Sequence, residues 1–129
     1  MTVGEIYTAV LAKLGESLDL DENTDYAERV PYIMGDFYRV AKDTDDKYRR
    51  AHNIEKRSTR ELVCFELEME FPLCDVFISP AILYIASDLL RYENESISED
   101  LNAEWILLMT GIETGLPAAV EKISERYPF

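Results

Sequence analysis

Residues 25–42 read DYAERVPYIMGDFYRVAK, and this stretch decides the fold class of the chain. Its apolar side chains recur every three or four residues, which places them on one face of a helix. They are Tyr26, Val30, Ile33, Met34, Phe37, Tyr38 and Ala41. Because Pro31 lies inside the pattern and removes one backbone hydrogen bond, the stretch predicts one kinked helix over residues 25–42.

Similar patterns predict helices on both sides of this stretch. Upstream, residues 3–14 carry an apolar stripe between a capping box, Thr2 and Glu5, and a stop at Gly15. Downstream, helices are predicted over residues 80–93, 99–114 and 118–126, the first two capped by Ser79 and Ser98. The 129 residues fit a single domain, so we expect one mostly α domain of four to five helices over residues 1–129.

One segment departs from the helical period. Residues 65–71 read FELEMEF, in which every second residue is apolar and the three between them are glutamates. Strict alternation predicts a short, half-buried strand with an acidic outer face, in an insertion over residues 61–72. A lone strand leaves backbone groups unpaired, so we expect it to pair with residues 54–62 as a hairpin, or with another chain.

The charge of the chain is large and unevenly distributed. There are 13 basic and 26 acidic residues, which gives a formal net charge of −13 and argues against a protein that binds nucleic-acid phosphates. Residues 39–60 hold eight basic and four acidic groups, whereas the segments on both sides are strongly acidic. Within this region, residues 43–60 have no clear apolar stripe and are predicted to form a basic loop, in which residues 43–53 can hold a helical turn around Tyr48.

Two interpretations of the basic region remain open. Either the basic region folds back onto its own acidic flanks, or it reaches the acidic face of a neighbouring copy, where opposite charges fix the orientation of the two copies. The second interpretation, with the predicted strand, gives a candidate subunit interface. Its residues are Arg49, Arg50, Lys56, Arg57, Arg60, Phe65, Leu67 and Met69.

Neither a catalytic site nor a cofactor or metal site is predicted. His52 is the single histidine, and Cys64 and Cys74 are expected to be reduced thiols without a catalytic partner. Residues 19–25, DLDENTD, imitate the start of a calcium loop, but Thr24 stands where the loop needs glycine and Val30 where it needs glutamate. The chain also lacks a signal peptide pattern and an apolar run long enough for a membrane span. We therefore expect a protein that is not an enzyme.

The order of segments resembles that of small phage and prophage structural proteins of Gram-positive hosts. The resemblance covers most of the chain, from MTVGEIY at residues 1–7 to the C-terminal tail. It is sharpest at residues 25–34, DYAERVPYIM, and at residues 71–98, FPLCDVFISPAILYIASDLLRYENESIS. Within the virion, the proteins it resembles are head–tail connectors, also called adaptor or neck proteins.

The resemblance implies a non-enzymatic subunit of a ring, usually twelvefold, with portal and tail or neck proteins as partners. It implies assembly in the bacterial host cytoplasm, a final location in the virion, and DNA that passes through the ring without sequence-specific binding. Alternatives are a capsid accessory protein, a tail completion protein, or an acidic inhibitor that mimics nucleic acid. An inhibitor would be a monomer or dimer that captures a basic partner.

Overall fold

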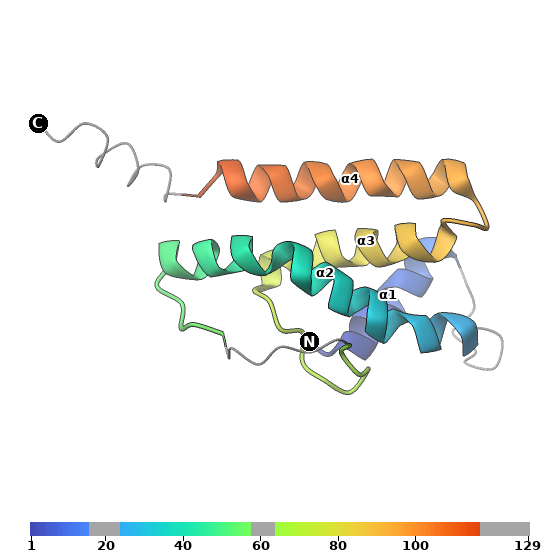
Figure 1. Ribbon diagram of the computed structural model, residues 1–129, viewed down its shortest axis with the longest axis horizontal. Helices are drawn as coiled ribbons and strands as arrows, with labels where there is room; N and C mark the ends of the chain where they lie inside the picture. Colours follow the sequence, from blue (N-terminus) through green and yellow to red (C-terminus); the bar gives the residue numbers. More distant parts are fainter. Residues whose placement is uncertain (16–23, 58–63, 117–129) are drawn as a thin grey trace, which may run out of the picture.

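The computed structural model describes residues 1–15, 24–57 and 64–116, and within these ranges the chain is mostly α-helical. The elements are α1 (Val3–Leu14), α2 (Thr24–Ala51), the short 3-10 helix η1 (Asp75–Phe77), α3 (Ile78–Leu90) and α4 (Glu95–Thr114), shown in Figure 1. The predicted mostly α fold class is confirmed. The predicted helix over residues 118–126 lies outside the described residues. None of the helices in the described ranges is long and apolar enough to cross a membrane.

Helix α1 has the bounds and caps that the sequence predicts. The Thr2 hydroxyl accepts a hydrogen bond from the Glu5 backbone N–H at 3.1 Å, and the Glu5 carboxylate accepts one from the Thr2 N–H. At the other end, Gly15 adopts the left-handed conformation, with φ of 69°, that ends many helices. Five buried side chains on one face then join α1 to the core: Val3, Ile6, Tyr7, Val10 and Leu11.

Helix α2 is longer than predicted, and the predicted basic loop over residues 43–60 is wrong for its first half. The helix runs through Pro31 without interruption, bends along its length, and ends only at Ala51 (Figure 1). Beyond Ala41, the side chains that it buries are polar, namely Thr44 and Asp45. A search for apolar periodicity therefore misses this half, because its buried contacts are hydrogen bonds and ion pairs.

The segment at residues 64–71 has the predicted alternation of side chains but forms no hairpin with any described residue. Phe65 is buried and the next three apolar residues are half-buried against the core, while the glutamates between them are exposed. The backbone, however, meets α1: the carbonyls of Leu67 and Met69 accept hydrogen bonds from the N–H groups of Gly4 and Val3, both at 2.8 Å.

The first N–H groups of a helix have no partner within the helix, and this contact supplies one. The β pairing among the described residues is one isolated antiparallel bridge, between Thr2 and Glu70. The hairpin prediction is therefore wrong among the described residues, because part of the segment's hydrogen-bonding capacity caps α1. Residues 58–62 of the expected partner lie outside the described ranges.

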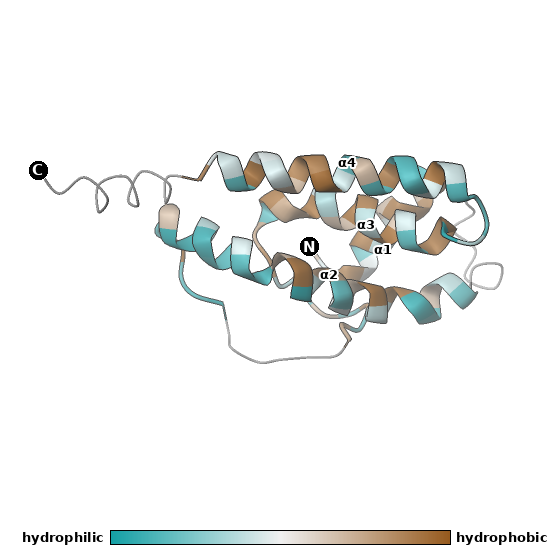
Figure 2. Ribbon diagram, turned by 45° about the horizontal axis from the view of Figure 1, so that its top comes forward, coloured by the Kyte–Doolittle hydropathy of each residue, from teal (hydrophilic) through white to brown (hydrophobic). Residues whose placement is uncertain are grey.

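Helix α3 lies at the centre of the molecule, with α4 along one side and α1 and α2 on the other (Figures 1 and 2). A row of rings joins three helices: the ring centroid of Tyr84 on α3 is 5.4 Å from that of Phe37 on α2 and 5.0 Å from that of Trp105 on α4. These contacts join α2 and α4 to α3, and the C-terminal half of α2 also reaches α4 directly, where the Thr44 hydroxyl donates to the Glu113 carboxylate at 3.0 Å.

Helix α4 begins earlier in the sequence than predicted, at Glu95. Asn94, not Ser98, caps the helix, since its side-chain oxygen accepts a hydrogen bond from the Ile97 N–H at 3.2 Å. Ser98 is instead buried against α3, where its hydroxyl donates to the Ser87 carbonyl at 2.7 Å and the Ser87 hydroxyl donates to the Ser98 carbonyl at 2.8 Å. The hydroxyl of Ser98 thus joins α4 to α3 instead of capping α4. The sequence alone does not distinguish these two roles.

Candidate functional site

The strongest concentration of basic groups surrounds an open hollow at the C-terminal end of α2. Its volume is about 470 Å³, and the last turns of α2 and the segment that follows it form its walls. Seven residues line it: Asp46, Arg49, Arg50, Asn53, Ile54, Lys56 and Arg57. We call this feature the basic hollow. It is notable because four of the 13 basic residues of an acidic chain gather in it.

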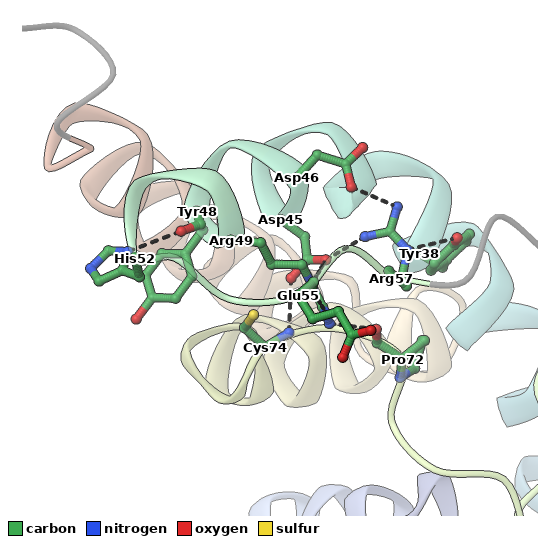
Figure 3. Close-up of polar contacts among 10 residues, drawn as sticks. All are labelled: Tyr38, Asp45, Asp46, Tyr48, Arg49, His52, Glu55, Arg57, Pro72 and Cys74. Carbon is green, nitrogen blue, oxygen red and sulfur yellow. Dashed lines mark hydrogen bonds and ion pairs between the residues drawn. The ribbon is translucent and has the colours of Figure 1, made fainter. Parts of the chain in front are cut away.

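A buried carboxylate holds the hollow in shape. Asp45 is completely buried, and its Oδ2 accepts hydrogen bonds from Nε of Arg49, at 2.8 Å, and from Nη1 of Arg57. Its Oδ1 accepts the backbone N–H of Cys74 at 2.9 Å (Figure 3). A buried charge is strongly unfavourable unless it is paired and hydrogen-bonded, and Asp45 meets both conditions.

The two arginines connect segments that are distant in the sequence. Arg49 also donates to the Glu55 carbonyl at 2.9 Å and to the Pro72 carbonyl at 3.2 Å, so that it joins α2 to the segment after it and to the segment before η1. Arg57 donates to the hydroxyl of Tyr38 at 3.0 Å and lies over the Tyr38 ring, 5.1 Å from its centroid. Figure 3 shows these contacts and the position of Asp45 between the two arginines.

The electrostatic environment favours the charged form of Arg57. Burial by itself would lower the pKa of this guanidinium, but the hydrogen bond to Tyr38 and the carboxylates of Asp46 and Asp45 together raise the pKa. Asp46 also forms an ion pair with Arg57 at 3.1 Å. Two arginines are thus balanced by two aspartates, and neither arginine is available to a partner without breaking this network.

Two cations in the hollow are not balanced in this way. Arg50 and Lys56 are exposed, and neither side chain forms a hydrogen bond or an ion pair with another residue that the structure describes. Ile54, whose side chain is also exposed, adds an apolar surface to the lining. The hollow is therefore a mixed surface with one exposed apolar side chain and surplus positive charge, which suits an acidic, partly apolar protein segment.

The eight predicted interface residues do not form one surface. Arg50 and Lys56 lie in the hollow as exposed cations, whereas Arg49 and Arg57 point inward to Asp45, and Arg60 lies outside the described residues. The three residues of the predicted strand, Phe65, Leu67 and Met69, pack against the core of their own chain. Phe65 is buried in the core of its own chain, with its ring 5.0 Å from that of Tyr38. Leu67 and Met69 pack partly against the same core.

The structure therefore supports part of each interpretation of the basic region, namely that it folds back onto its own chain and that it reaches a neighbouring copy. Arg49 and Arg57 fold back onto acidic groups of their own chain, although these groups belong to α2 itself and not to the distant acidic flanks. Arg50 and Lys56 remain exposed for a neighbour. The sequence did not carry this difference: Asp45 and Arg49 are four residues apart on a helix and can pair, but Asp46 and Arg50 have the same spacing.

A second exposed surface, missed by the sequence analysis, lies on the outer side of α4. Ile106 and Leu108 are both exposed, and the side chain of Leu107 between them is 72% exposed. Three consecutive apolar residues cannot all face one side of a helix, because each is rotated by about 100° from the last. That run was the signal for an outward apolar surface.

The described residues contain no cluster of metal-ligating side chains. Among them, no three His, Cys, Asp or Glu side chains are grouped so as to hold a metal ion. His52 is exposed, stacks on the Tyr48 ring at a centroid distance of 4.1 Å, and has Nδ1 3.0 Å from the Tyr48 carbonyl. The calcium-like stretch at residues 19–25 falls mostly outside the described ranges.

Comparison with known proteins adds no relative. The chain matches no family model, no curated protein and no solved structure. The two exposed surfaces are therefore the evidence on which a functional proposal has to stand.

Proposed function

We propose that the chain is a non-enzymatic structural subunit of a phage virion, a head–tail connector that joins other copies in a ring between portal and tail. The observation that carries the proposal is the pair of unlike exposed surfaces on one small acidic chain. One is the basic hollow, and the other is the apolar outer side of α4, a helix whose own charged residues are all acidic. Subunits of a head-to-tail ring need two different faces of this kind.

The distribution of charge supports the same proposal. A ring around a DNA channel works best when its inner wall does not hold phosphates, and an acidic wall repels them. The hollow gathers basic groups on one side of the chain, so acidic surface is left for the channel. In the assembled particle we expect Arg50 and Lys56 to lie between subunits and not in the channel wall.

The test is to locate the chain in particles released by the host bacterium. We expect mass spectrometry of purified virions to detect it, and cryo-electron microscopy to place its helices in a ring between head and tail. Absence from the particles would overturn the proposal. A channel wall lined by residues 47–57 would contradict the charge argument.

Native mass spectrometry of material captured from the host separates this proposal from the nucleic-acid mimic. A connector is captured with portal or tail proteins. A mimic is captured as a monomer or dimer with a basic, nucleic-acid-binding protein, and that result would replace the proposed function.

A further inference from the structure

The outer side of α4 has an apolar centre and an acidic border. Leu107 forms the centre with an exposed fraction of 72%, and Ile106 and Leu108 lie on either side of it with exposed fractions of 46% and 42%; we call these three residues the α4 patch. All twenty residues of α4 are described; five of them are acidic and none is basic. Exposed apolar groups gathered in this way are typical of a surface that contacts another protein.

The basic hollow has the complementary character. Its exposed apolar residue, Ile54, lines the hollow together with Arg50 and Lys56, two cations whose side chains have no partner among the described residues. An apolar centre that meets an apolar centre, with opposite charges around it, is the usual composition of a specific interface. The α4 patch and the hollow fit each other in both respects, whereas two hollows, or two α4 patches, would oppose like charges.

One copy of the chain cannot bring these two surfaces together. In Figures 1 and 2, α4 lies along one side of the molecule, and the segment after α2 that forms the hollow departs on the opposite side. The Leu107 side chain is 72% exposed, so it faces solvent and not the rest of its own chain. The surfaces can meet only when they belong to different copies.

We propose that the α4 patch of one copy docks into the basic hollow of a second copy. The proposal rests on the proposed function, since it names the surfaces that would join neighbouring subunits. Leu107 contacts Ile54 and the aliphatic stems of the cations, and Arg50 and Lys56 pair with Asp100 and Glu104. Each copy has one surface of each kind, so the contact repeats from copy to copy and is heterologous.

Two variants each damage one surface. Leu107→Asp places a charge in the α4 patch, and the double variant Arg50→Glu, Lys56→Glu reverses the charge of the hollow. We expect sedimentation velocity to show self-association of the wild type that weakens with salt, and at least about a tenfold loss in either variant. Val40→Asp, an exposed apolar position on α2, is the control for the first variant, and Lys13→Glu, Lys47→Glu is the control for the second.

Mixing the two damaged variants tests whether the contact is head-to-tail. The Leu107→Asp copy keeps an intact hollow and the double variant keeps an intact α4 patch, so a 1:1 mixture should form a dimer and nothing larger. Circular dichroism of each variant shows whether it is folded. The proposal is overturned if the wild type stays monomeric at millimolar concentration, if the variants associate as the wild type does, or if mixing restores no dimer.

These outcomes are distinct from a failure of the proposed function. Association through the two surfaces, together with absence from virions, leaves the docking contact standing and removes the connector role. Presence in virions, with both damaged variants incorporated as efficiently as the wild type, removes the docking contact and leaves the connector role.

Discussion

The Nε atom of Arg49 lies 2.8 Å from the Oδ2 atom of Asp45, one turn earlier on α2, and the Asp45 side chain is completely buried. The same carboxylate receives Arg57 from the segment after α2 and the N–H of Cys74 from the segment before η1. One aspartate thus holds together three parts of the chain and shapes the wall of the basic hollow.

Removing the charge of Asp45 should strongly destabilise the fold. Asp45→Asn leaves the two guanidinium groups partly buried without their shared counter-charge, a change that costs about 3–5 kcal/mol in comparable buried pairs. Urea unfolding followed by circular dichroism measures the loss. Asp43→Asn, an exposed neighbour on the same helix, should change the free energy of unfolding by less than about 0.5 kcal/mol. Equal effects of the two substitutions would contradict the role given to Asp45.

Gly4→Ala should destabilise the protein even though alanine favours helices. A Cβ atom on Gly4 would lie 3.0 Å from the Leu67 carbonyl oxygen, the atom that accepts the Gly4 N–H. That carbonyl is backbone and is fixed by the hydrogen bond, so we expect a loss of about 1–3 kcal/mol, typical of overpacking. Thermal unfolding of the variant measures it, and a raised melting temperature would show that residues 64–71 do not cap α1 as described.

Gly111→Ala should have the opposite effect on the single chain. A Cβ atom at this position in α4 meets nothing within 4 Å, so the substitution gains helix propensity, about 0.5–1 kcal/mol, without a clash. Gly111 lies one turn after Leu107, next to the α4 patch, where a partner would approach. We therefore predict a more stable fold by urea unfolding and weaker self-association by sedimentation, and an increase in both quantities would argue against a partner at this position.

The thiol of Cys74 should be unreactive at neutral pH. Burial, followed by the hydrogen bond to Asp45 and the charge of that carboxylate, raises the pKa of Cys74 from 9.0 to about 11. Because the thiolate is the reactive form, alkylation of a Cys64→Ser variant should rise steeply only near pH 11. Rapid labelling of the folded variant at pH 8, followed by mass spectrometry, would contradict this environment.

The same shift makes stability depend on pH in the alkaline range. The folded state favours the neutral thiol, so its contribution is fully present below pH 9 and is lost as the pH rises from about 9 to about 11. Cys74→Ala should remove that part of the decline, which urea unfolding between pH 8 and pH 11 can measure. An unchanged pH profile would show that another group is responsible.

Apolar periodicity and capping chemistry predict most of this fold. The bounds of α1 follow from Thr2, Glu5 and Gly15, all of which act within a few residues of each other. The alternation at residues 65–71 likewise predicts which side chains are exposed. The pairing of that segment could not be predicted, because its partner is the N-terminus of α1, more than sixty residues away in the sequence.

The candidate site was harder to predict for a related reason. Its framework is a charged network around Asp45, and hydrophobic patterning does not register a helix that buries a carboxylate. Basic residues at 49, 50, 56 and 57 look alike in the sequence, yet two face Asp45 and two face solvent. Only the fold separates them, because the direction of each side chain depends on where α2 ends and the chain turns.

The central claim, that copies join through the α4 patch and the basic hollow, is tested most directly by disulfide cross-linking. Leu107→Cys and Ile54→Cys are introduced separately into a chain with Cys64→Ser and Cys74→Ala, and the two proteins are mixed under mild oxidation. Dimers that link one variant to the other, and that are rare in either variant alone, are the predicted result. Equal cross-linking within each variant alone, or no cross-link in the mixture, would contradict the claim.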